Sequence, residues 1–146
     1  MSRLRVAVCG AGNWGRNHVR TVASLPEAEL VAVCDPDAKR LAQVARQYPA
    51  VQTTADLEET LDLAEAVVVA APATHHATIA TAAIERGLAV GQQHRLRSVV
   101  RGGNHEPGQP ALGDHRHARA HAVCATAVEQ HRAKPRRHVA AHQLRG

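Results

Sequence analysis

Residues 6–15, Val-Ala-Val-Cys-Gly-Ala-Gly-Asn-Trp-Gly, join a short apolar run to a glycine-rich turn. A segment with helical spacing and a second apolar run follow, and Asp35 lies twenty residues after Gly15. A strand, a glycine turn, a helix, a strand and an acid in this order are typical of one half of a dinucleotide-binding site. A glycine turn without a ligand is the alternative, and the acid at the expected distance disfavours it.

Each glycine of this turn has a physical reason to be there. Gly10 would make the sharp exit from the strand, Gly12 would let backbone approach a pyrophosphate, and Gly15 would let the helix pack closely. The pyrophosphate would lie on the helix N-terminus, where free N–H groups favour an anion. The carboxylate of Asp35 would accept hydrogen bonds from the adenosine ribose hydroxyls. We expect NAD, with NADP disfavoured, because a 2′-phosphate would meet like charge at Asp35.

The charge of the 146-residue chain is divided unevenly along the sequence. Residues 1–90 carry eight Lys and Arg against ten Asp and Glu, a net charge of −2, and residues 91–146 carry ten against three, a net charge of +7. The overall net charge of +5 therefore belongs to the C-terminal part. It says nothing about the partners of the first ninety residues.

The cysteines and the apolar runs indicate a cytoplasmic protein without a membrane partner. Cys9, Cys34 and Cys124 are widely spaced and show no metal-ligand spacing, so we expect small buried hydrophobic residues rather than ligands. The sequence has no apolar run of about 18 residues and no signal-like segment.

Apolar runs alternate with segments of helical spacing as far as residue 90, which predicts an α/β fold. We expect strands over 4–9, 30–34, 50–53, 66–71 and from 88, and helices over 14–25, 36–47, 57–61 and 74–86. The first helix is expected to turn Val19, Val22 and Ala23 toward the sheet. Right-handed crossovers then give a doubly wound parallel sheet in the order 3-2-1-4-5, with ligands bound where the order reverses.

Residues 4–90 resemble the N-terminal half of the glucose-fructose oxidoreductase / inositol dehydrogenase (Gfo/Idh/MocA) family. The resemblance is carried by residues 10–15 (Gly-Ala-Gly-Asn-Trp-Gly), 33–37 (Val-Cys-Asp-Pro-Asp), 71–76 (Ala-Pro-Ala-Thr-His-His) and 82–87 (Ala-Ala-Ile-Glu-Arg-Gly). It implies a Rossmann domain of an NAD(P)-dependent oxidoreductase that acts on sugar, cyclitol or sugar-nucleotide hydroxyls.

The family's Pro-x-x-x-His motif falls on Pro72 and His76, which the resemblance places near the nicotinamide ribose. The alternative for His76 is a half-buried residue of the helix N-terminus without a ligand contact, and His75 is expected in solvent. The candidate cofactor-binding residues are Gly10, Gly12, Asn13, Trp14, Gly15, Asp35, Ala71, Pro72 and His76.

The sequence departs from the family after the fifth predicted strand. The family has Glu-Lys-Pro there, and its lysine sits beside the nicotinamide and the substrate hydroxyl. Residues 90–97 read Val-Gly-Gln-Gln-His-Arg-Leu-Arg and contain no lysine. We therefore assign no catalytic residue, and we expect residues 1–90 to form a dinucleotide-binding domain that lacks this motif. A non-catalytic NAD-binding remnant and a basic binding module are the alternative functions.

Residues 91–146 lack the pattern of a folded domain. They contain no Ile, Phe, Tyr, Trp or Met, three Leu and five Val, and eight of the eleven histidines. So little apolar surface does not offset the entropy of ordering a chain, and we expect a largely unstructured basic tail. His117 and His121 have a spacing that suits metal ligands, but no third ligand accompanies them. The tail's arginines suit phosphate contacts, but without aromatic residues to stack on bases they do not favour a nucleic-acid partner.

The composition of residues 91–146 is also that of a GC-rich gene translated out of frame, and we hypothesise a frame change near codon 90. The nucleotide sequence tests this directly. Another frame after Val90 should encode an apolar-patterned continuation that begins close to Glu-Lys-Pro. If neither alternative frame does so, the hypothesis is wrong.

Overall fold

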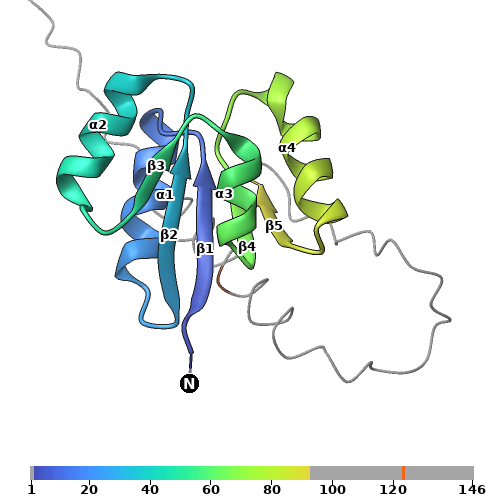
Figure 1. Ribbon diagram of the computed structural model, residues 1–146, viewed down its shortest axis with the longest axis horizontal. Helices are drawn as coiled ribbons and strands as arrows, with labels where there is room; N and C mark the ends of the chain where they lie inside the picture. The colour runs from blue at the N-terminus through green and yellow to red at the C-terminus, as the bar shows by residue number, and fades with distance from the viewer. Residues whose placement is uncertain (1, 93–122, 124–146) are drawn as a thin grey trace, which may run out of the picture.

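The fold is a five-stranded parallel sheet in the order β3-β2-β1-β4-β5 (Figure 1). It comes from a computed structural model that describes residues 2–92 and Val123. The strands are β1 (Leu4–Cys9), β2 (Ala28–Cys34), β3 (Gln52–Thr54), β4 (Ala66–Val69) and β5 (Ala89–Gln92). The helices are α1 (Asn13–Ser24), α2 (Ala38–Gln47), α3 (Leu57–Leu63) and α4 (Ala73–Glu85). The predicted α/β class, the parallel sheet and its strand order are confirmed.

The central strands β1 and β4 are buried on both faces of the sheet. Val8 pairs with Val33 on β2 and with Val68 on β4, and all three side chains have no exposed area. Every residue of β4 is fully buried, as its uninterrupted apolar run predicts. The strand ends at Val69, two residues earlier than predicted, because its partner β1 ends at Cys9.

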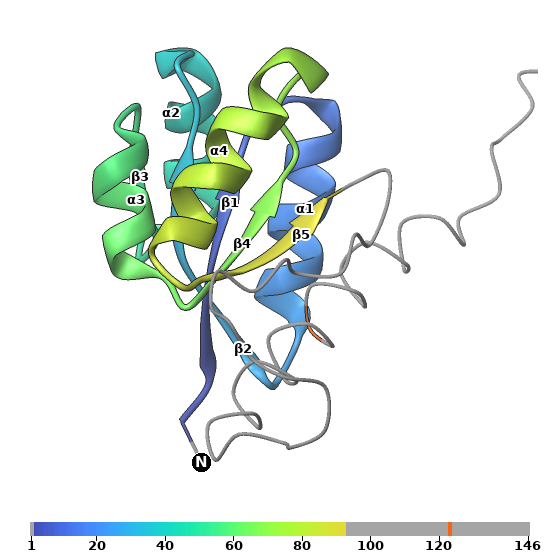
Figure 2. The ribbon, with the colours of Figure 1, turned by 90° about the vertical axis from the view of Figure 1, so that its right-hand side faces the viewer.

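The helices cover the two faces of the sheet in pairs, as the two views of the ribbon show (Figures 1 and 2). On one face, Val19 and Val22 of α1 and Val44 of α2 pack with the alternate residues of β1. On the other, Leu61 of α3 and Ala83 of α4 pack with the remaining ones. This arrangement is doubly wound, so the strand order reverses between β1 and β4.

Val123 is the single described residue beyond β5. It is 7% exposed and belongs to the core cluster on the face covered by α1 and α2. The predicted unstructured tail begins at Gly91, but Gly91 and Gln92 are the last residues of β5 and pair with Val68 and Val69 of β4, so the prediction is wrong for these two residues. The rest of the predicted tail, residues 93–122 and 124–146, lies outside the described residues.

The buried stripe of α1 differs from the predicted one by a small rotation. Gly15, His18, Val19 and Val22 are buried, and Ala23 is exposed. These four positions follow the i, i+3, i+4, i+7 pattern of a helix face. Gly15 packs against Gly10, and this contact fixes the rotation of α1 about its axis. In that orientation His18 faces the sheet and Ala23 faces outward.

Aspartates cap two of the helices, whereas α1 begins without a side-chain cap. The Asp37 side chain accepts hydrogen bonds from the first-turn amides of α2, and Asp56 accepts them from those of α3. Glu59 follows Asp56 by three residues, the spacing of a capping box, but its carboxylate accepts hydrogen bonds from Gln52 and Thr54 instead. Gly12 at the start of α1 supplies no side-chain oxygen, and the first turn of α1 holds no acid.

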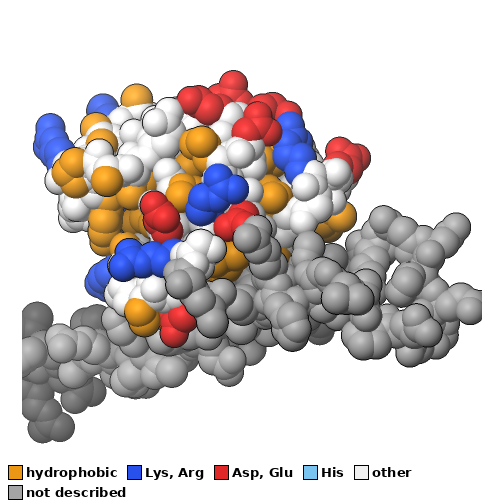
Figure 3. Space-filling model, turned by 60° about the horizontal axis from the view of Figure 1, so that its bottom comes forward, with side chains coloured by type: hydrophobic (Ala, Val, Ile, Leu, Met, Phe, Trp, Pro, Cys, Tyr) orange, Lys and Arg blue, Asp and Glu red, His pale blue; other side chains and the backbone are white. Residues whose placement is uncertain are grey.

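Side chains of both charges lie on the face drawn in Figure 3, where several Asp and Glu side chains gather along the upper edge. No helix in residues 2–92 combines the length and the apolar character needed to cross a membrane.

We predict that Gly15→Ala destabilises the fold strongly. A Cβ at this position would lie 1.7 Å from the carbonyl oxygen of Gly10, so helix and turn would have to separate. Overpacking of this kind costs about 1–3 kcal/mol and here should reach at least the upper end. Urea unfolding followed by circular dichroism measures the loss.

Gly12→Ala is the matched control for this prediction. Within residues 2–92, its Cβ would meet the Arg40 side chain alone, at 3.9 Å, apart from its chain neighbours. At a helix start this change should cost less than about 1 kcal/mol. Equal losses for the two variants would contradict the packing argument.

Candidate functional site

The glycine turn lies at the carboxyl end of β1, where the strand order reverses. Gly10 has φ of +105°, which an L side chain rarely adopts, and its N–H donates to the carbonyl of Cys34 at 2.7 Å. A Cβ on Gly10 would lie 2.6 Å from the carbonyl carbon of Ala70, so the turn contacts the chain leaving β4. Near Gly12, by contrast, Arg40 is the one described residue, apart from the chain neighbours, that comes within 4 Å of the Cβ position. Backbone therefore packs closely against Gly10, whereas the described residues leave space next to Gly12.

The N-terminus of α1 suits an anion. A helix start leaves N–H groups without intrahelical partners and carries the positive end of the helix dipole. In α2 and α3, aspartates satisfy these groups, whereas α1 has no side-chain cap. A phosphate group lying over Gly12 would take the place of the missing cap.

Asp35 points from the end of β2 toward the glycine turn, as the prediction required. Its side chain is 3% exposed, and Oδ2 accepts a hydrogen bond from the Ala11 N–H at 2.7 Å. Oδ1 accepts from the Asp37 N–H at 2.8 Å. Because a carboxylate oxygen has two lone pairs, each oxygen retains one acceptor site for a ribose hydroxyl.

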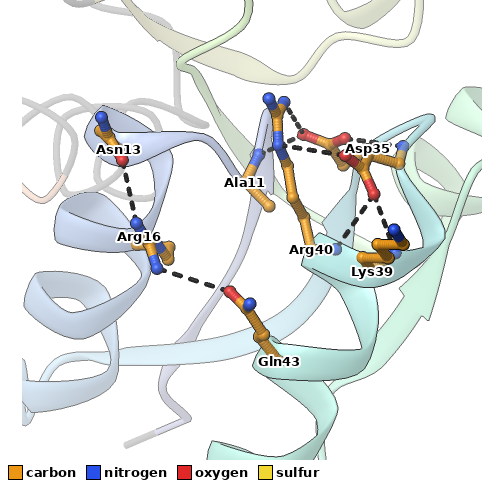
Figure 4. A network of polar contacts seen from close by, with 8 residues as sticks. Ala11, Asn13, Arg16, Asp35, Lys39, Arg40 and Gln43 are labelled. Carbon is orange, nitrogen blue, oxygen red and sulfur yellow. Dashed lines mark hydrogen bonds and ion pairs between the residues drawn. The ribbon is translucent and has the colours of Figure 1, made fainter.

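A pocket of about 350 Å³ opens between the glycine turn, α1 and α2. Its lining consists of Ala11, Gly12, Asn13, Arg16, Asp37, Lys39, Arg40 and Gln43. Figure 4 shows the Arg40 side chain over the Asp35 carboxylate, with Nη1 at 3.6 Å from Oδ2. Arg16 donates to the side-chain oxygens of Asn13 at 2.9 Å and Gln43 at 3.4 Å, so it joins α1 to α2.

The loop after β4 meets the glycine turn at Gly10 but does not line this pocket. Pro72 begins α4, and Nε2 of the half-buried His76 lies 2.6 Å from the carbonyl oxygen of Ala71. The carbonyl can only accept, so Nε2 is the donor and the ring fixes the shape of its own loop. His75 is exposed, as expected.

A family model, described as an oxidoreductase family with an NAD-binding Rossmann fold (Gfo/Idh/MocA), matches residues 4–96. The match covers more than half of the chain. The chain belongs to the Gfo/Idh/MocA family. Both the expected family and the expected Rossmann fold are confirmed.

Three relatives show how much of the family's length is present. An inositol 2-dehydrogenase of Corynebacterium glutamicum (strain R) is 33% identical over 90 residues, which cover 60% of this chain and 27% of the relative. The solved structure of GenD2 from gentamicin A biosynthesis, in complex with NAD, is 34% identical with a TM-score of 0.59, and the match covers 63% of this chain and 27% of GenD2. The solved structure of UDP-N-acetylglucosamine 3-dehydrogenase GnnA of Acidithiobacillus ferrooxidans is 27% identical with a TM-score of 0.57, and the match covers 63% of this chain and 30% of GnnA. The chain thus spans between a quarter and a third of these relatives.

All but one of the predicted site residues of this Gfo/Idh/MocA chain fall into two groups. Gly12 and Asn13 line the pocket, Asp35 lies beneath Arg40, and Gly10 and Gly15 support the turn from within. A second group sits on the β4 side of Gly10: Ala71, Pro72 and His76. Trp14, in the first turn of α1, is 52% exposed.

Arg16, Lys39, Arg40 and Gln43 also line the pocket, and the sequence reasoning missed them. A signal for three of them is present in the sequence. Arg16 follows the glycine turn directly, and Lys39 and Arg40 follow Asp35 by four and five residues, so all three fall near predicted helix starts. Cations are disfavoured there by the helix dipole, so a cluster of them indicates an anionic neighbour.

Two thiols lie under the site, because Cys9 and Cys34 are register partners at the ends of β1 and β2. The pKa of Cys34 is lowered to about 7, chiefly by a hydrogen bond from the Cys9 thiol and further by Thr60, against the effect of burial. The pKa of Cys9 is raised by the same hydrogen bond and by burial. Both residues are buried and free, as predicted, and Cys124 lies outside the described residues.

Residues 2–92 and Val123 contain no cluster of three His, Cys, Asp or Glu side chains placed to hold a metal ion. His117 and His121, with the spacing of metal ligands, lie outside the described residues.

Proposed function

We propose that this chain holds NAD for an oxidoreductase that acts on sugar, cyclitol or sugar-nucleotide hydroxyls. The observation that carries the proposal is the Asp35 carboxylate, which faces the glycine turn beside the uncapped N-terminus of α1. The names of the relatives support the substrate class, since they include an inositol dehydrogenase and a sugar-nucleotide dehydrogenase.

In this proposal different residues of the site bind different parts of the cofactor. The first-turn amides of α1, over Gly12, hold the pyrophosphate. The remaining lone pairs of Asp35 accept the hydroxyls of the adenosine ribose, and the pocket between α1 and α2 takes the adenosine. Preference for NAD follows, because the carboxylate binds hydroxyl donors and repels a phosphate at the 2′ position.

The nicotinamide half would lie on the β4 side of Gly10, near Pro72 and His76. When bound there, NAD would supply the hydride acceptor of the reaction. The hydroxyl proton released with that hydride needs a base, which in this family is the lysine of Glu-Lys-Pro. Residues 90–97 contain no lysine. His76 is held by the carbonyl of Ala71, so we give it a role in shaping the loop.

The second candidate function is a non-catalytic NAD-binding module. The lysine-free sequence at 90–97 favours it, because this chain would then bind the cofactor without completing proton transfer. Both functions require the same cofactor site, and turnover separates them.

We predict that the ribose contact of Asp35 can be measured by pairing a variant with a cofactor analogue. Titration calorimetry should give wild-type protein a clearly weaker affinity for 2′-deoxy-NAD than for NAD. One hydrogen bond to a charged group contributes about 1.5–3 kcal/mol, which is about 10- to 100-fold in Kd.

The Asp35→Ala substitution should lower the affinity for NAD. The variant should bind NAD and 2′-deoxy-NAD with almost equal affinity, because the carboxylate that accepts the hydrogen bond of the 2′-hydroxyl is absent. The two cofactors are compared within the variant because losing the hydrogen bond from Ala11 also disturbs the glycine turn, which would lower the affinity for both. Equal affinities of the wild-type protein for NAD and 2′-deoxy-NAD would remove Asp35 from the ribose site.

We also predict that the purified chain binds NAD without turning over substrate. Absorbance at the wavelength of NADH should stay at background with myo-inositol, scyllo-inositol and a panel of sugars, under conditions where calorimetry shows the cofactor bound. Reduction of NAD above background would exclude the non-catalytic module and require a base other than the missing lysine.

A further inference from the structure

Cys9 and Cys34 lie side by side at the ends of β1 and β2, where the glycine turn and Asp35 follow. Their Cα atoms are register partners, and both side chains belong to the apolar cluster on the face covered by α3 and α4. Adjacent strands lie about 4.8 Å apart, within the range of about 4.4–6.8 Å between Cα atoms that a disulfide joins. A bond between the two sulfurs therefore requires little movement of the backbone.

The backbone around the two cysteines holds the strand ends together. The pairing of β1 with β2 is regular over the last three residues of both strands. Directly beyond it, the Gly10 N–H donates to the carbonyl of Cys34 at 2.7 Å, and the Ala11 N–H donates to Asp35 at 2.7 Å. Folding has thus already met the entropic cost of bringing together two cysteines that are distant in the sequence.

The two thiols differ in exposure and in protonation. Cys34 is 9% exposed and Cys9 is 1% exposed, so a small oxidant reaches Cys34 first. The hydrogen bond from Cys9 lowers the pKa of Cys34 to about 7, although burial and the carboxylates of Asp35 and Asp56 raise it. The same hydrogen bond, together with burial, raises the pKa of Cys9. Near neutral pH the thiolate, which is the reactive form, is therefore on Cys34, and the proton stays on Cys9.

The surroundings of the two thiols favour redox chemistry over metal binding. A zinc site takes four ligands, at least three of them from the protein. Across residues 2–92 and Val123, no three His, Cys, Asp or Glu side chains are grouped in a way that could hold a metal ion. Two thiols in contact, without further ligands in the described part of the chain, have the composition of a dithiol that closes to a disulfide.

We propose that Cys9 and Cys34 form a redox-active dithiol, which a small peroxide oxidises to a disulfide across the ends of β1 and β2. The burial of both sulfurs selects hydrogen peroxide over bulkier oxidants. The disulfide ties together the two strand ends from which the glycine turn and Asp35 emerge. This site goes beyond the function proposed above and does not depend on cofactor binding.

The reaction has two steps, and Cys34 is the first nucleophile. Its thiolate attacks one oxygen of hydrogen peroxide and breaks the O–O bond, which leaves a sulfenic acid on Cys34 and, after protonation, releases water. The sulfur of Cys9 then attacks the sulfur of Cys34, loses its proton and displaces the hydroxyl group as a second water. The two sulfurs lose two electrons in total, and the peroxide gains them. A dithiol reductant reverses the change.

The test is peptide mapping of the folded full-length chain after treatment with hydrogen peroxide. Wild-type protein and the Cys124→Ser variant are treated, their remaining thiols are alkylated in denaturant, and both are digested with trypsin. Trypsin places Cys9 in peptide 6–16, Cys34 in peptide 21–39 and Cys124 in peptide 120–132. We expect peptides 6–16 and 21–39 joined, with the loss of two hydrogen atoms, in both proteins. Dithiothreitol should separate them, and peptide 120–132 should not be part of the link.

Single substitutions test the order of the two steps. Cys9→Ser lacks the second thiol, so peroxide should add oxygen to Cys34 in peptide 21–39 without forming a link. Cys34→Ser should leave Cys9 without added oxygen under the same conditions, because the more buried, protonated thiol remains. Circular dichroism checks that both variants fold. If either does not, the linked peptides of the protein with both cysteines still decide the main claim.

Two results would overturn the proposal. Both cysteines of the folded chain stay fully alkylatable after peroxide treatment, or the link between peptides 6–16 and 21–39 forms in urea and not in the folded chain. Oxygen added to Cys9 in Cys34→Ser, with none added to Cys34 in Cys9→Ser, would contradict the order of the steps. None of these results bears on NAD binding, which calorimetry measures separately.

Discussion

The hydrogen bond from the Ala11 N–H to the Asp35 carboxylate is the contact on which the site depends. It joins the turn after β1 to the end of β2 at 2.7 Å, in a position where Asp35 is almost fully buried. A buried carboxylate is costly unless its oxygens are satisfied, and here backbone N–H groups satisfy one acceptor site on each. The same bond therefore holds the Asp35 carboxylate against the glycine turn.

Around this contact, the packing of the domain serves to bring helix starts and strand ends to one edge. The sheet is buried on both faces, and its two central strands end together at Cys9 and Val69. Helices leave from that edge on both sides, so their N-termini converge above it (Figures 1 and 2). Only α1 among the first three begins without a capping aspartate. The N-terminus of α4, which follows Pro72, also lacks a side-chain cap, so α1 and α4 both begin with N–H groups that no described side chain satisfies.

The sequence predicted those features that depend on spacing along the chain. Strand order follows from the alternation of elements, and the direction of Asp35 follows from its place directly after a strand. Features that depend on side chains from separate elements were not predicted. Arg16 and Gln43 contact each other from α1 and α2, and the rotation that buries His18 is set by Gly15 against the turn. These depend on how the helices dock, which no local pattern specifies.

The close approach of Gly15 to the carbonyl of Gly10 has a consequence for how the turn behaves before any ligand arrives. The first turn of α1 rests directly on the backbone of the glycine turn, so neither can shift without the other and the rigid sheet beneath them. Their conformational freedom is lost when the domain folds rather than when a dinucleotide docks. Association then loses little entropy from ordering this segment, which favours affinity through preorganisation.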